Sequence, residues 1–146
     1  MLYRDQASDR IAYTIAGAVY VYDLWARYDQ TGRTFYLAHE IGHLLDTRTS
    51  PLHLLMGEVS GEFAQKVGAF VDEQGRYQLG KSFPHYDSPD SIRHRSDSAS
   101  EDWAESFATV VLPSFEASLR DIGNARDSEV RDHLCQWDAV FARATD

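Results

Sequence analysis

Residues 35–46, FYLAHEIGHLLD, carry the strongest helical pattern in the sequence. Their apolar side chains recur at three- and four-residue spacing, which is typical of a helix with one buried face. The pattern follows a turn signal at Gln30-Thr31-Gly32 and should end near Thr47. Because four residues make about one helical turn, His39 and His43 project from the same face. The sequence therefore predicts a helix that presents two imidazole rings side by side.

The His-Glu-x-x-His motif in this helix predicts a metal site. His39 and His43 can both reach one tetrahedral Zn²⁺ ion. Glu40 is rotated by about 100° from His39, so its carboxylate faces a water on the open side of the metal rather than the metal itself. Buried histidines without a metal would have to be hydrogen-bonded in the core, which is the alternative interpretation. We expect Zn²⁺ at the two histidines and Glu40 as a base.

A second motif downstream offers the third ligand. Ser98-x-x-Glu101 satisfies a capping box, so a helix should begin there and continue to Pro113. Glu101 and Glu105 lie one turn apart on it, and one can bind the metal while the other accepts a ring N–H from a ligating histidine. Asp102 is expected to be a solvated acidic residue, favoured by the helix dipole.

The two motifs in this order resemble those of the gluzincin metallopeptidases, most closely the group related to the catalytic domain of anthrax lethal factor. The resemblance covers residues 17 to 110. It implies that Glu101 is the third zinc ligand, that Glu105 supports the site and that Glu40 is the general base of peptide hydrolysis. An aspartate three residues after the second histidine is frequent in that group. We expect this residue, Asp46, to pair with a neighbour of the site or structurally rather than to bind metal.

One position departs from that group. The family commonly has a tyrosine seven residues before the third ligand, where its hydroxyl is thought to stabilise the oxyanion, and this chain has His94 there. Tyr86 lies nearby in the same stretch. Either His94 or Tyr86 is therefore the candidate oxyanion donor.

The whole pattern predicts a single zincin-like α+β domain over residues 1–146, mostly helical, with a small sheet beside the active-site helix. Residues 18–22 should form an edge strand along which an extended peptide pairs. Further helices are expected over residues 51–70 and 128–142, and residues 71–97 should be a long polar loop. The first ten residues are expected to be loosely attached, with room for a missing upstream segment.

Composition excludes several classes of protein. The net charge of −9 repels phosphate backbones, so nucleic-acid binding is not expected. The longest uncharged apolar stretch, residues 11–22, is shorter than the roughly 20 residues of a membrane span and does not resemble a signal peptide.

The chain is compatible with the cytoplasm or with secretion as part of a larger precursor, and its oligomeric state is open. His53 and His133 should be surface or core residues, and Cys135 a small buried apolar group.

These observations favour a zinc-dependent endopeptidase acting on a peptide or protein. A non-catalytic, zinc-stabilised module that binds a partner through exposed tyrosines is the alternative from a different class. A deformylase-like hydrolase is disfavoured, because that family supplies a cysteine ligand upstream of the histidine pair and Cys135 lies downstream.

Overall fold

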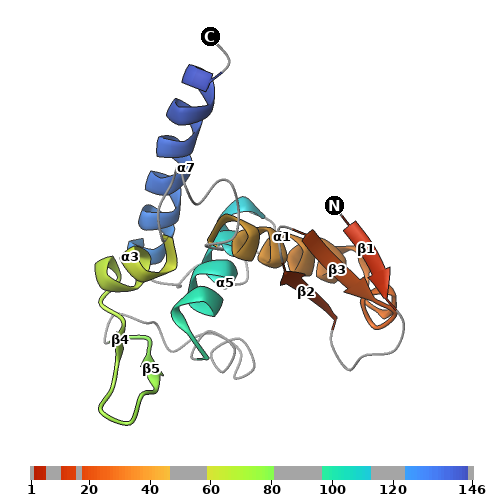
Figure 1. The fold of residues 1–146 in the computed structure, drawn as a ribbon, viewed down its shortest axis with the longest axis horizontal. Helices are drawn as coiled ribbons and strands as arrows, with labels where there is room; N and C mark the ends of the chain where they lie inside the picture. The colour runs from red at the N-terminus through yellow and green to blue at the C-terminus, as the bar shows by residue number, and fades with distance from the viewer. Residues whose placement is uncertain are drawn as a thin grey trace.

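The computed structural model describes residues 2–5, 11–15, 18–46, 59–80, 97–112 and 124–144. These residues form a mixed, helix-dominated α+β structure (Figure 1), as the sequence predicts at this coarse level. In chain order the elements are β1 (Leu2–Asp5), β2 (Ala12–Ile15), β3 (Ala18–Tyr22), the 3₁₀ helix η1 (Trp25–Arg27), α1 (Gln30–Asp46), α3 (Val59–Lys66), β4 (Phe70–Val71), β5 (Tyr77–Gln78), α5 (Ala99–Val111) and α7 (Asn124–Ala144).

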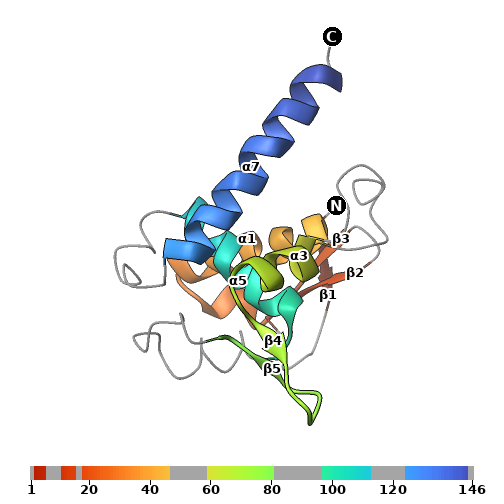
Figure 2. The same ribbon diagram turned by 90° about the vertical axis from the view of Figure 1, so that its left-hand side faces the viewer.

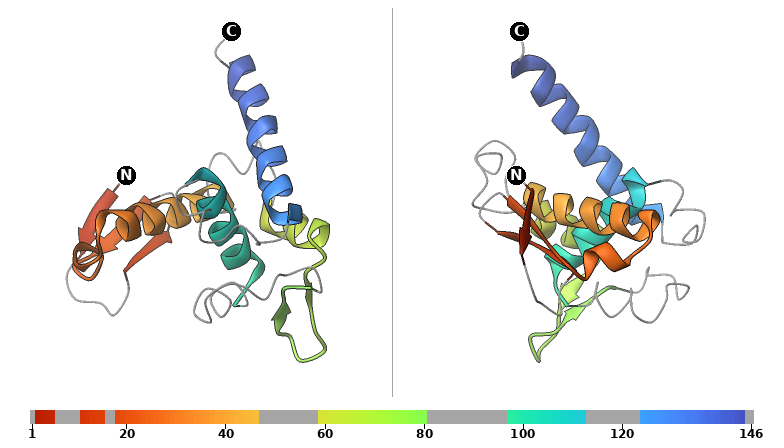
Figure 3. Two further views of the ribbon diagram at one scale, coloured as in Figure 1. Left: turned by 180° about the vertical axis from the view of Figure 1, so that it is seen from behind. Right: turned by 90° about the vertical axis from the view of Figure 1, so that its right-hand side faces the viewer.

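The three-stranded sheet corrects two expectations. Its order is β1-β3-β2, with β1 parallel and β2 antiparallel to β3, so β3 is the central strand and not the edge. Residues 2–5, within the first ten residues that were expected to be loosely attached, form β1 and pair with β3. Residue 1 and residues 6–10 lie outside the described residues. β3 is rich in β-branched and aromatic residues, which suit a strand with neighbours on both sides. Val19 and Val21 are buried, while Tyr13 stacks on Tyr20 across the strands. The sheet lies at one end of the molecule, against α1 (Figure 3).

The two helices that carry the motifs form where the sequence predicts them. α1 ends at Asp46, and its start is stabilised by the Asp29 carboxylate, which accepts a hydrogen bond from Gly32 N at 2.8 Å. α5 begins after Ser98, whose Oγ accepts from Glu101 N at 3.2 Å. This bond is the predicted N-cap, and it satisfies a backbone donor that would otherwise lack a partner in the first turn.

α5 occupies the centre of the structure, in contact with α1, α3 and α7 (Figure 2). Trp103 on α5 is fully buried, and its ring packs against Phe63 of α3 and against His133 and Trp137 of α7. Four rings from three helices therefore form the centre of the core, and His133 belongs to it.

A buried ion pair beside this core corrects the expectation for Asp102. The Asp102 carboxylate is completely buried and accepts two hydrogen bonds from the Arg126 guanidinium, at 2.9 and 2.7 Å. Tyr77 Oη donates to the same carboxylate at 3.0 Å, and Arg126 also donates to the carbonyl of Leu79. Asp102 is not a solvated residue of the first turn, because α7 and the β4–β5 hairpin cover it and supply its partners.

Other parts differ from the predicted pattern. Within residues 51–70 the described helix is α3, and residues 51–58, with His53, lie outside the described residues. The first part of the expected loop, residues 71–80, contains one arm and the turn of a hairpin, in which Val71 pairs with Tyr77 and Gly75 has φ +78°. Residues 81–96 of that loop lie outside the described residues. α7 is longer than predicted and projects from the body (Figure 1). Cys135 is exposed rather than buried, because it lies on the side of α7 opposite to the buried His133 and Trp137.

Candidate metal centre

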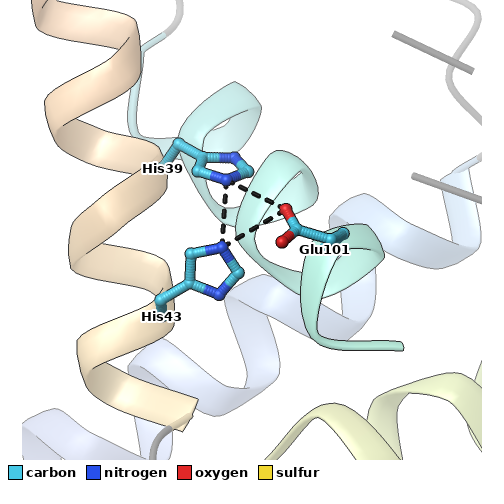
Figure 4. Close-up of side chains that lie close together, drawn as sticks. All are labelled: His39, His43 and Glu101. Atoms are coloured by element: carbon cyan, nitrogen blue, oxygen red, sulfur yellow. Dashed lines mark hydrogen bonds and ion pairs between the residues drawn. The ribbon is translucent and has the colours of Figure 1, made fainter. Parts of the chain in front are cut away.

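His39, His43 and Glu101 bring three potential ligand atoms together between α1 and α5 (Figure 4). The two Nε2 atoms are 3.0 Å apart, and Glu101 Oε2 lies 3.2 Å from His39 Nε2 and 3.3 Å from His43 Nε2. Two ligands bonded to one tetrahedral zinc at about 2.0–2.1 Å stand about 3.3 Å from each other. The three atoms therefore already have the mutual spacing of three zinc ligands, and the donor set of two imidazoles and a carboxylate is one that zinc binds.

The close crossing of α1 and α5 brings these groups together. Gly42 lies against Ala104, since a Cβ built on Gly42 would stand 2.9 Å from Ala104 Cα. Trp103 Nε1 donates a hydrogen bond to the Gly42 carbonyl at 3.0 Å and holds the two helices at this point. The glycine of the His-Glu-x-Gly-His sequence is thus the residue that lets the helix bearing Glu101 approach the histidines.

The pKa values of Glu101 and His43 are both shifted in this centre. Burial alone would raise the pKa of Glu101, but hydrogen bonds and positive charge from His39 and His43 hold it well below its usual range. Burial would likewise lower the pKa of His43, yet the Glu101 carboxylate, with smaller contributions from Glu40 and Asp46, raises it above 6.5. Without a metal, the folded protein therefore favours a proton on His43 next to a charged Glu101.

Glu40 stands apart from the three converging atoms. It is only 7% exposed, and its Oε2 accepts a hydrogen bond from Thr14 Oγ1 at 2.7 Å. The same hydroxyl lies 3.0 Å from the Glu40 carbonyl oxygen. Thr14 belongs to the edge strand β2, and nothing in the sequence pattern predicted its contact with the glutamate. The sheet therefore helps to hold the Glu40 carboxylate.

The far side of each histidine ring faces a residue of α5. His39 Nδ1 lies 3.5 Å from Glu105 Oε1, and His43 Nδ1 lies 3.1 Å from Ser100 Oγ. The sequence predicted that Glu105 would lie beside a histidine of the site, but it did not predict the contact of Ser100. The sequence feature that could have indicated Ser100 is its position in the first turn of the helix, directly before Glu101. There it lies on the side of α5 that meets α1.

Asp46 is buried away from the three ligand atoms, and its Oδ1 accepts a hydrogen bond from Ser60 N at 2.7 Å. Ser60 is the second residue of α3, so Asp46 caps the start of that helix. The two candidates for the oxyanion donor, Tyr86 and His94, lie outside the described residues. Their roles stay predictions.

Comparison of the chain with protein families, curated proteins and solved structures gave no match. Among the described helices, none combines the length and apolar character that spanning a membrane requires.

Proposed function

We propose that this protein is a zinc-dependent metallopeptidase of the gluzincin type with a zincin-like fold, in which His39, His43 and Glu101 hold the metal. The observation that carries the proposal is the spacing of the three ligand atoms, 3.0, 3.2 and 3.3 Å, in a centre assembled from two helices. A bound zinc ion lowers the pKa of a coordinated water to about 7 and polarises a carbonyl group.

Glu40 is the general base in this proposal. Its carboxylate is buried next to the histidines but is held by Thr14 instead of joining Glu101. A carboxylate in this place accepts a proton from the attacking water and returns it to the leaving amine. His94 or Tyr86 remains the proposed hydrogen-bond donor to the developing oxyanion.

The substrate in this proposal is an extended peptide. With β3 in the centre of the sheet, the edge beside α1 is β2, whose outer side has no strand neighbour among the described residues. A peptide that added to this edge would form main-chain hydrogen bonds and run close to Thr14 and Glu40. β2 therefore replaces β3 as the strand that receives the substrate.

Replacement of Glu40 tests this function. Glu40→Gln keeps the size and much of the hydrogen bonding of the side chain and removes the base. It should bind zinc as the wild type does and lose peptidase activity by about 10²- to 10⁴-fold on a peptide library. Glu73→Gln, the same change at an exposed position of the β4–β5 turn, is the matched control and should leave turnover unchanged. Zinc-loaded wild type without turnover would instead favour the non-catalytic binding module.

A further inference from the structure

Each histidine of the candidate centre has a different partner behind its ring. His39 Nδ1 faces the Glu105 carboxylate at 3.5 Å, a distance too long for a strong hydrogen bond. His43 Nδ1 lies 3.1 Å from the hydroxyl of Ser100, within hydrogen-bond range. The shorter of the two supporting contacts is therefore made by a neutral hydroxyl.

When His43 binds a metal, the chemistry of its imidazole ring decides which atom is the donor in the contact with Ser100. A histidine that uses Nε2 as a ligand carries its remaining proton on Nδ1, and that N–H needs an acceptor to keep the ring in one orientation. Both Nε2 atoms point toward Glu101, which leaves His43 Nδ1 to donate to Ser100 Oγ.

The position of Ser100 makes it a rigid support. It lies in the first turn of α5, directly before Glu101, and this turn is stabilised by the bond from Glu101 N to Ser98 Oγ. A single turn of helix therefore carries one ligand, Glu101, and the partner of another ligand, His43. Movement of this turn would displace both at once.

We propose that Ser100 is a positioning residue of the metal centre, which orients His43 and selects the tautomer that binds metal through Nε2. The inference rests on the proposed zinc site and not on peptidase activity. A role in folding alone predicts a different result: Ser100→Ala would lower the melting temperature of the metal-free protein and leave the zinc affinity of the folded chain unchanged.

The test is the zinc affinity of the full chain, measured by competition with a chromophoric chelator. Ser100→Ala should weaken zinc binding by about 10- to 100-fold, the usual effect of losing such a partner. The melting temperature of the metal-free protein should change little, because the better helix propensity of alanine offsets the lost hydrogen bond to His43. Ser100→Thr keeps the hydroxyl and should recover most of the affinity. Ser128→Ala, the same change at an exposed position of α7, is the control and should bind zinc as the wild type does.

Nuclear magnetic resonance of the zinc-loaded protein gives a second readout. The His43 Nδ1 proton should exchange with solvent faster in Ser100→Ala than in wild type. Wild-type zinc affinity in Ser100→Ala, or equal losses in the alanine and threonine variants, would overturn the role of Ser100 and leave the zinc site standing. Absence of zinc binding by the wild type would overturn both.

Discussion

Gly42 of α1 and Ala104 of α5 lie in such close contact that a Cβ on Gly42 would stand 2.9 Å from Ala104 Cα. The residues on both sides of Ala104 also contact α1. Trp103 donates a hydrogen bond to the Gly42 carbonyl, and Glu105 lies behind the ring of His39. The separation of α1 and α5 thus sets the distance from the histidines to the carboxylates of α5.

Gly42→Ala should weaken both the fold and the metal site. The added methyl group meets backbone, which cannot turn aside, and overpacking of this kind costs typically about 1–3 kcal/mol. Urea unfolding should show this loss in the metal-free protein, and zinc affinity should fall because Glu101 moves away. Gly32→Ala in the same helix meets only side chains of Tyr28 and Asp29, at 3.2 to 3.3 Å, and should cost less. Equal stability of Gly42→Ala and wild type would contradict the close crossing.

Glu101→Ala should lose most of its zinc in elemental analysis, because only two of the three converging ligand atoms remain. Asp46→Ala should keep its zinc and lose about 0.5–2 kcal/mol of stability, since it removes the hydrogen bond to Ser60 N at the start of α3. The reverse pattern, with zinc retained in Glu101→Ala and lost in Asp46→Ala, would show that the ligands are assigned wrongly.

The increase in melting temperature that zinc produces should become larger as the pH rises from about 6 to about 8. The pKa of His43 is raised above 6.5 in the metal-free protein, so the favourable His43–Glu101 pair is fully formed below 6.5 and is lost as the pH rises through the raised value. Zinc requires the neutral ring, and at low pH it must displace this proton. Melting temperatures with and without zinc across this range measure the effect, and a difference that did not vary with pH would count against the coupling.

Thr14→Val should lower kcat by about tenfold or more and leave zinc content unchanged. Valine keeps the shape of threonine but removes the hydroxyl that donates to Glu40 Oε2, and a hydrogen bond to a charged group is worth about 1.5–3 kcal/mol. Thr14→Ser retains the hydroxyl and should stay close to wild type. If valine and serine variants had the same kcat, the hydrogen bond would have no part in holding Glu40.

Arg126→Met should destabilise the protein by about 3–5 kcal/mol, because it leaves the Asp102 carboxylate buried without its positive partner. Arg126 and Asp102 are 1% and 0% exposed, so water cannot replace the lost contact. Thermal unfolding measures the loss. The double variant Arg126→Met, Asp102→Leu should recover part of it, and a single variant as stable as wild type would contradict the burial.

Local patterns in the sequence were sufficient for the two helices and for most of the candidate centre. The spacing of His39 and His43 places both rings on one face of any helix, and Ser98 can cap a helix through a bond only three residues long. These features depend only on residues close together in the sequence, so they can be predicted before the fold is known.

Only the tertiary structure decided which polar groups face one another across elements. Thr14 meets Glu40, and Arg126 meets Asp102, through contacts between residues far apart in the sequence that no local periodicity encodes. The order of the strands was equally hidden, because a strand of alternating Val and Tyr suits an edge or a centre until its partners are known. Helical spacing indicated the two candidate histidine ligands, and the resemblance to the gluzincins indicated Glu101 as the third. The distances among these three groups, and the residues behind the histidine rings, depend on how closely Gly42 lets two helices pack.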